Sequence, residues 1–297
     1  MKPTVMMKQS WNKTLKTILA ILLLGLCMGT ACRLSASILY GADGAGGNLS
    51  NLYILNPTNG SIISTVGPIG FSITGLAIDP TTGVLYGSTS RNGAPTGNLV
   101  TIDQTTGTGT LVGSYGVPNH TMADLTFTSN GTLYGWAESS LDDLHTINKS
   151  TGAATDVGNA GISTFGSGLA ANSADVIYFT GSGASGPLRI VNKTTGLPTT
   201  VATLSGAPFP TLAIDALAFD GSILFGVNGA DGGPGGTSFD LVTINTITGV
   251  VTDLGPTVNN LDAIVFTPEP ATWVAGVLVF ATLAFSQRRR TVSRPRN

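Results

Sequence analysis

Short runs of apolar residues broken by polar turns follow one another through most of this 297-residue chain. In LVTIDQTTG (99–107) apolar and polar side chains alternate before the turn, as expected of a half-buried β-strand. Other runs, such as GLAID (75–79), are small and apolar throughout, which is typical of a strand buried on both faces. No long amphipathic helix lies between these runs. The pattern predicts an all-β fold of many short strands.

The runs recur with a period near 46 residues. An apolar-aromatic-Gly strand starts each copy, and successive copies begin 46, 48, 44 and 47 residues apart. A strand that ends in Asn or Asp follows, then a turn that closes on Gly, a third strand, and a small apolar strand. Asn or Asp opens such a turn by bonding its own backbone, and Gly supplies the positive φ. The copies begin at Leu39, Leu85, Leu133, Ile177 (degenerate, Ile177-Tyr178-Phe179) and Leu224.

Four strands per repeat and five repeats predict a five-bladed β-propeller over residues 37–267. If the small apolar inner strand is counted as the first of each blade, the domain begins with a second strand near residue 37 and ends with a first strand at 261–267. One blade therefore takes three strands from the N-terminal side and one from the C-terminal side, which closes the ring without open edges. The repeat unit resembles the blades of NHL-like and YVTN-like surface propellers. A right-handed β-solenoid and a pair of sandwiches are the alternatives.

The N-terminal segment, residues 1–36, has the composition of a secretory signal peptide. Four lysines precede the apolar run at 17–28, and small residues follow at Gly29, Ala31 and Ala36. We expect export by the Sec machinery. An uncleaved N-terminal anchor and a lipoprotein signal at Cys32 are the alternatives. The two cysteines, Cys27 and Cys32, both lie in this segment, so the propeller contains no thiol nucleophile and no disulfide framework.

The C-terminal segment, residues 268–297, carries three features in order. A Pro-Glu-Pro tripeptide comes first, then an apolar run over 271–285, and then a basic tail; the residues concerned are Pro268, Glu269, Pro270, Arg288, Arg289 and Arg290. This order resembles the PEP-CTERM sorting signal. The resemblance implies recognition by an exosortase, a transient helix in the membrane, and delivery to the cell surface or extracellular matrix. An ordinary C-terminal anchor is the alternative.

Charge is strongly segregated along the chain. Residues 37–267 hold fifteen acids and only four bases, whereas the other ten bases lie in the two terminal segments. An acidic domain with four scattered bases has no surface for a phosphate backbone, which argues against nucleic-acid binding. Exopolysaccharide and surface proteins are the partners that the sorting resemblance suggests.

Binding residues concentrate on variable loops over a rigid scaffold, so we expect a site on the face that carries the long loops. Two of these loops, GADGAGG (41–47) and GADGGPGG (229–236), resemble each other and belong to blades that ring closure makes neighbours. Asp43, Asn228 and Asp231 would supply oxygen ligands for Ca²⁺. Their spacing fits no defined calcium loop, and two flexible Gly-rich loops are the alternative. No other cofactor is predicted.

The remaining candidates give no catalytic constellation. Asp215 and Asp262 occupy matching positions just before two inner strands, with Asp124 one residue out of phase, where they would ring the axis or cap loop amides. Trp136 and Glu138 would contact a sugar ring or pack between blades. His120 and His145 fall in different repeat phases, and no catalytic residue is predicted. The sequence therefore favours a non-catalytic binding or structural propeller, with an extracellular lyase or lactonase acting on polysaccharide as the alternative.

Overall fold

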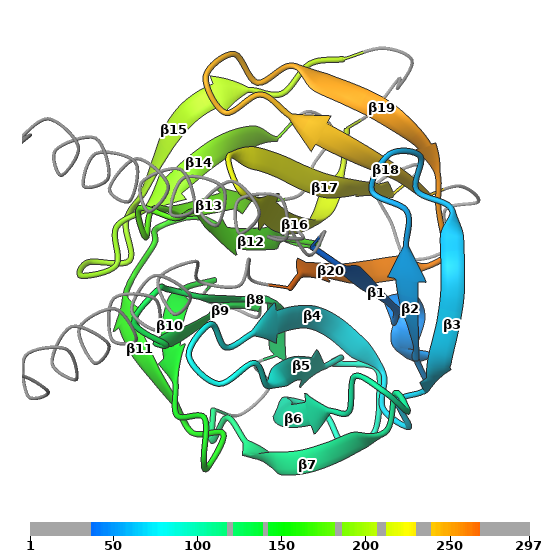
Figure 1. The fold of residues 1–297 in the computed structure, drawn as a ribbon. Coiled ribbons are helices and arrows are strands. Elements are labelled where there is room, and N and C mark those ends of the chain that lie inside the picture. Colours follow the sequence, from blue (N-terminus) through cyan, green and yellow to red (C-terminus); the bar gives the residue numbers. More distant parts are fainter. Residues whose placement is uncertain are drawn as a thin grey trace, which may run out of the picture. The chain divides into compact units, whose positions relative to one another are not determined.

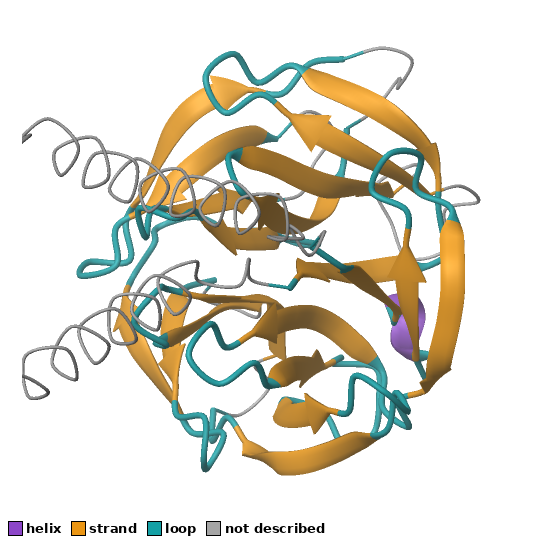
Figure 2. Cartoon of the chain, viewed as in Figure 1, coloured by secondary structure: helices purple, strands orange, loops and turns teal. Residues whose placement is uncertain are grey.

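The computed structural model describes residues 37–117, 121–138, 142–181, 186–206, 212–229 and 239–267. Five four-stranded antiparallel sheets surround a common axis as the blades of a β-propeller (Figure 1), which confirms the predicted fold. The only helix among these residues is one short turn, η1 (Ala45–Gly47) (Figure 2). In this part of the chain no helix has the length and apolar character needed to cross a membrane. The predicted signal peptide and sorting segment lie outside the described residues.

Each blade runs from an inner strand at the axis to an outer strand at the rim. Blade 1 consists of β20 (Leu261–Phe266), β1 (Leu39–Asp43), β2 (Asn51–Leu55) and β3 (Ile62–Pro68). Blade 2 consists of β4 (Ile73–Ile78), β5 (Leu85–Thr89), β6 (Asn98–Ile102) and β7 (Gly109–Ser114). Blade 3 consists of β8 (Thr121–Phe127), β9 (Leu133–Glu138), β10 (Leu144–Ile147) and β11 (Ala154–Gly158). Blade 4 consists of β12 (Gly168–Ala171), β13 (Ile177–Thr180), β14 (Pro187–Val191) and β15 (Pro198–Thr203). Blade 5 consists of β16 (Ile214–Asp220), β17 (Ile223–Gly229), β18 (Phe239–Ile244) and β19 (Val251–Pro256).

The ring closes in the predicted three-plus-one manner. β20 pairs antiparallel with β1, from Leu39 opposite Phe266 to Asp43 opposite Leu261. Two further bonds extend the pairing: the Thr267 amide donates to the Ile38 carbonyl, and the Ile38 amide donates to Thr267 Oγ1, each at 2.9 Å. The last strand of the chain is therefore the inner strand of the first blade, and Ser37–Glu269 form one compact unit.

The hydrophobic core lies between the blades. Five buried clusters each draw their side chains mainly from two adjacent blades, so every blade contributes to two clusters. The Gly of the apolar-aromatic-Gly strand leaves room for this packing. A Cβ on Gly135 would lie 2.9 Å from Ile147 Cδ1 and 2.9 Å from Met122 Cγ, which are the side chains of the strands on either side. This Gly is therefore required by side-chain volume.

The Gly-closed turns join neighbouring blades as well as neighbouring strands. Asn148 Oδ1 accepts the Ser150 amide at 2.9 Å, and Gly152 closes the turn with φ of 80°. A Cβ on Gly152 would lie 2.3 Å from the Gly113 carbonyl oxygen, which belongs to the outer strand of the preceding blade. The equivalent contacts are Gly60 with Gly255, Gly107 with Gly67, Gly196 with Gly158, and Gly249 with Thr203. Thus one Gly per blade serves both turn geometry and blade docking.

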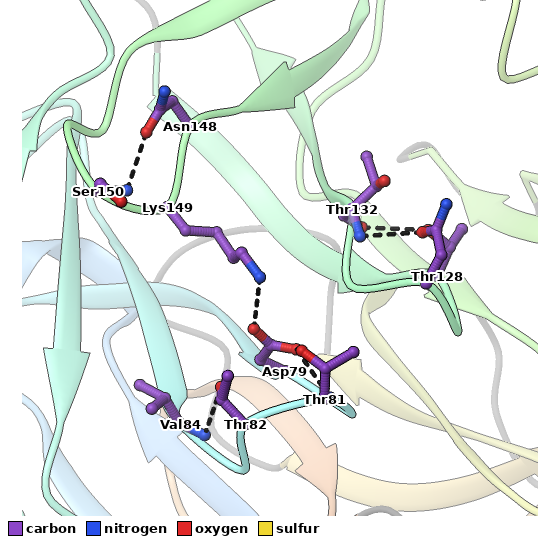
Figure 3. A network of polar contacts seen from close by, with 10 residues as sticks. Asp79, Thr81, Thr82, Val84, Thr128, Thr132, Asn148, Lys149 and Ser150 are labelled. Atoms are coloured by element: carbon purple, nitrogen blue, oxygen red, sulfur yellow. Dashed lines mark hydrogen bonds and ion pairs between the residues drawn. The ribbon is translucent and has the colours of Figure 1, made fainter.

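An ion pair on the face with the tight turns joins blades 2 and 3 (Figure 3). Lys149 Nζ lies 2.6 Å from Asp79 Oδ2, whose other carboxylate oxygen accepts bonds from the Thr81 amide and hydroxyl. Asp79 is buried, and burial alone would raise its pKa. The bonds from Lys149, Thr81 and Thr82 outweigh this effect and hold the pKa of Asp79 at about 2. This carboxylate is ionised at neutral pH and serves the fold.

Candidate binding site at the axial face

Three inner strands, β4, β8 and β16, begin two or three residues earlier than their apolar runs indicated, and four of the five inner strands contain a β-bulge. The register with the second strand skips one residue in blades 1, 2, 3 and 5, and these unpaired residues are Asp262, Thr74, Ala123 and Asp215. In the fourth blade, Ser167 occupies the corresponding place immediately before β12. Bulges re-aim a side chain relative to the ladder. Asp215 and Asp262 are therefore equivalent positions on the loop-bearing face, as their spacing predicted.

Glu138 joins these two aspartates from the end of β9. Its Oε2 atom lies 3.4 Å from Nη2 of Arg91, which follows β5 in the preceding blade. The Arg91 guanidinium also lies 4.7 Å from the ring centre of Phe165, which precedes β12 in the next blade. Arg91 thus links three successive blades at the margin of the group. We call Glu138, Asp215 and Asp262 the axial acidic cluster.

The carboxylates of the axial acidic cluster hold protons unusually strongly. Burial raises the pKa of Glu138 to about 7, while Ser167 and the Arg91 charge oppose the shift. Burial and then the Glu138 charge raise the pKa of Asp215 to about 8. Burial also raises the pKa of Asp262 well above its usual range, and Asp215 and Glu138 raise it further. The three side chains are near enough for each ionisation to oppose the others.

Two buried polar atoms of this site make no hydrogen bond of good geometry, although the Ser167 hydroxyl lies near enough to Glu138 to lower its pKa. They are Glu138 Oε1 and Ser167 Oγ, in residues that are 6% and 1% exposed. Asp215 and Asp262, in contrast, are partly accessible to solvent. A buried polar group without a partner costs roughly 1–3 kcal/mol, which a ligand that supplies the missing bond would recover. The arrangement combines unmet hydrogen-bonding capacity with acidic residues that are only half-buried.

Asp124 has a different role from the cluster. Its Oδ2 atom accepts the Leu169 amide at 2.8 Å and the Leu217 amide at 3.3 Å, and its Oδ1 atom accepts the Leu125 amide at 2.8 Å. These amides belong to the inner strands of three blades. Burial raises the pKa of Asp124 well above its usual range, although the backbone bonds oppose this. Asp124 therefore caps backbone amides, which was one of the two alternatives for these aspartates.

The residues predicted to bind Ca²⁺ already have structural contacts where they are described. Asp43 accepts the Asn51 amide at 2.6 Å and the Tyr53 hydroxyl at 3.1 Å. Asn228 Oδ1 accepts the Ala213 amide at 2.9 Å. Asp231 lies outside the described residues, so the calcium site stays a prediction. Within the described ranges, no three His, Cys, Asp or Glu side chains are grouped as a metal ion would require.

Trp136 and His145 are both buried, and Trp136 packs between blades 3 and 4. Trp136 is fully buried, its ring centre is 4.0 Å from that of Phe179, and its Nε1 donates to Thr164 Oγ1 at 3.0 Å. His145 is buried with Nδ1 3.2 Å from the Asp143 carbonyl oxygen. The packing interpretation of Trp136 is thus correct. His120 lies outside the described residues.

The sequence did not indicate three of the residues at this site: Arg91, Phe165 and Ser167. Ser167 could have been found by aligning the repeats on the position of Asp215 and Asp262. Nothing local marks Arg91 or Phe165, because their contacts come from different blades. All three lie on the predicted face, since residues that precede first strands and follow second strands meet at one end of the blades.

Comparison with known proteins identifies the fold and leaves the family open. No protein-family model matches the chain, and no curated protein matches it in sequence. One chain of a nidogen/laminin complex is similar in structure, with a TM-score of 0.52 and 12% identity over 79% of this chain and 99% of that one. A Bifidobacterium bifidum s17 protein assigned as a candidate exo-β-1,3-galactanase has a TM-score of 0.50 and 11% identity, over 74% of this chain and 88% of its own. At these identities the likeness concerns the β-propeller alone.

Proposed function

We propose that this protein is an exported cell-surface or matrix propeller that binds its ligand, without catalysis, at the axial acidic cluster. The observation that carries the proposal is the pair of buried atoms without a well-formed hydrogen bond, Glu138 Oε1 and Ser167 Oγ, beside the half-buried residues Asp215 and Asp262. A purely structural propeller gains nothing from such a group, because each unmet bond and each buried carboxylate lowers its stability. The position on the loop-bearing face supports the same conclusion.

The route to the surface is proposed from the terminal segments. Residues 1–36 direct export through the Sec machinery, and residues 268–297 act as a PEP-CTERM signal that an exosortase processes at Pro268-Glu269-Pro270. The apolar run holds the chain in the inner membrane until then, and Arg288, Arg289 and Arg290 keep its end in the cytoplasm. The last blade strand ends at Phe266, so the signal follows the folded ring directly.

Mass spectrometry of the mature protein tests this route. We expect a C-terminus near residues 268–270 in cells that contain an exosortase, and an uncleaved chain in cells from which it is deleted. An intact arginine-rich tail on the mature protein would make the segment an ordinary anchor.

Exopolysaccharide is the ligand that we propose, and surface proteins are the second class of partner. The test is retention of the propeller unit, residues 37–267, on polysaccharide from the producing cells. Wild-type protein should be retained, a Glu138→Gln/Asp262→Asn variant should be released, and an Asp253→Asn variant should behave as wild type. Asp253 is an exposed acid on the outer strand of blade 5, so its variant controls for the loss of charge alone. Equal retention of all three would refute binding at the cluster.

A second candidate, an extracellular lyase or lactonase acting on polysaccharide, follows from one observation. The pKa of Glu138 is about 7 and that of Asp215 about 8, which suits proton transfer near neutral pH. Polysaccharides and lactones should therefore be screened for turnover, with and without divalent metal. Turnover that Glu138→Gln abolishes would favour the enzyme over the binding protein.

A further inference from the structure

We propose that the axial acidic cluster binds the protonated amine of an amino sugar within a surface polysaccharide. The inference rests on the proposed function for the polysaccharide and on the cluster itself for the amine.

Negative charge exceeds positive charge at the cluster. The three carboxylates interact with one another, and Arg91 is the one base among the described residues whose charge reaches Glu138 and Asp262. That guanidinium is already engaged by Glu138 Oε2 and by the Phe165 ring. Lys149, a second base of the propeller, pairs with Asp79 on the opposite face. A ligand that brings a positive charge would let the carboxylates ionise together.

The unmet hydrogen bonds at the cluster match an ammonium group. Glu138 Oε1 can accept a bond, and Ser167 Oγ can accept or donate one. Asp215 and Asp262, which are half-buried residues, carry further acceptor oxygens. An ammonium carries three N–H donors and no acceptor, so it fits a group made mostly of acceptors. An acetylated amine has one N–H and no charge, and it satisfies far less of this site.

The residues at the margin of the cluster favour a sugar as the molecule that bears the amine. Phe165 is 40% exposed at the margin of the cluster, and Arg91 lies across its ring with a side chain that is 44% exposed. An aromatic ring offers an apolar surface to the C–H groups of a saccharide, and a guanidinium donates to its hydroxyl oxygens. A divalent cation would instead need closely converging oxygens. The described carboxylates form no such three-ligand group, whereas an ammonium needs only two or three acceptors, which Glu138, Ser167 and one of the two aspartates would supply.

Calorimetric titration of the propeller unit, residues 37–267, tests the inference. The probes are a glucosamine hexamer, its fully N-acetylated counterpart, and CaCl₂ alone. We expect the amine hexamer to bind at least tenfold more tightly than the acetylated one. Its affinity should pass through a maximum near neutral pH, because Glu138 and Asp215 ionise as the pH rises while the amines of the hexamer lose their protons.

The variants should separate the cluster from the general acidity of the domain. Asp215→Asn/Asp262→Asn should weaken amine binding at least tenfold, Ser167→Ala should weaken it roughly threefold to tenfold, and Asp253→Asn should leave it unchanged. The Asn variants keep side-chain shape and remove charges whose burial is unfavourable, so they should fold, which their melting temperatures will show.

Each contrary outcome has a distinct meaning. Equal binding of the two hexamers, or undiminished binding by the double variant, would overturn the inference. Calcium that binds at the cluster and displaces the amine would assign the site to a metal instead. Retention on cell polysaccharide that depends on Glu138 but shows no preference for amines would refute the inference and leave the proposed function intact. Absence of retention on any polysaccharide would refute the proposed function as well.

Discussion

Replacing Gly152 with alanine tests whether the repeat glycines join the blades. Gly152 closes the turn after β10 with φ of 80°, and a Cβ there would lie 2.3 Å from the Gly113 carbonyl oxygen. Gly83 is a matched control, because it has φ of 76° in a turn of blade 2 and a Cβ there would meet nothing within 4 Å. Both variants therefore share the backbone strain, and only Gly152→Ala adds a clash with the neighbouring blade.

The structure sets the expected magnitudes. Alanine in the left-handed region costs about 1–2 kcal/mol at either position. Overpacking against a backbone oxygen adds about 1–3 kcal/mol at Gly152, since blade 3 must move away from blade 2. We therefore expect Gly152→Ala to destabilise the propeller by about 2–5 kcal/mol and Gly83→Ala by about 1–2 kcal/mol.

Thermal and urea unfolding of the two variants measure this difference. In a domain of this size, 1 kcal/mol corresponds to about 2–4 °C in melting temperature, so Gly152→Ala should melt several degrees below Gly83→Ala. Equal losses of stability in the two variants would refute the docking role and leave the turn geometry as the only function of this Gly.

Three further predictions concern other parts of the fold. Asp215 stays protonated in the folded protein and ionises when the chain unfolds, so the free energy of unfolding should fall by up to about 5 kcal/mol between pH 4 and pH 8. In Asp215→Asn the free energy of unfolding, measured with urea, should change much less over that range. Lys149→Met leaves the buried Asp79 carboxylate unpaired and should cost about 3 kcal/mol, against little for Lys193→Met at the equivalent turn position; equal losses would contradict this ion pair. Deletion of 261–267 exposes the edge of β1 and should give an aggregating, protease-sensitive product; a monomeric, resistant product would contradict the closure.

The sequence predicted the fold well because every blade repeats the same pattern of strands and turns. Five copies of the same strand and turn pattern fixed the number of blades, and the phase of the first and last copies fixed the ring closure. Inner-strand boundaries were less accurate. The bulges at Thr74, Ala123 and Asp215 let β4, β8 and β16 start two or three residues before their apolar runs. A bulge depends on register, which single-strand patterns do not contain.

The candidate site was only partly predictable for a related reason. Asp215 and Asp262 stood out because they share a repeat position, and Glu138 was noted beside Trp136. Arg91 and Phe165 join the site through contacts between blades that are 47 or more residues apart in sequence. The raised pKa values depend on burial in the assembled ring, which no local pattern reveals. The repeat glycines were assigned to turn geometry, and their contact with the preceding blade emerged only from the structure.

Carboxyl-carbon NMR titration of the propeller unit, with and without the glucosamine hexamer, tests the central claim most directly. In the free protein we expect Glu138 to titrate near pH 7 and Asp215 near pH 8. Binding should lower the pKa of both, because an ammonium in contact stabilises the ionised forms. Titration of all three carboxyls of the cluster below pH 5, or curves that the hexamer leaves unchanged, would contradict a ligand site at the axial acidic cluster.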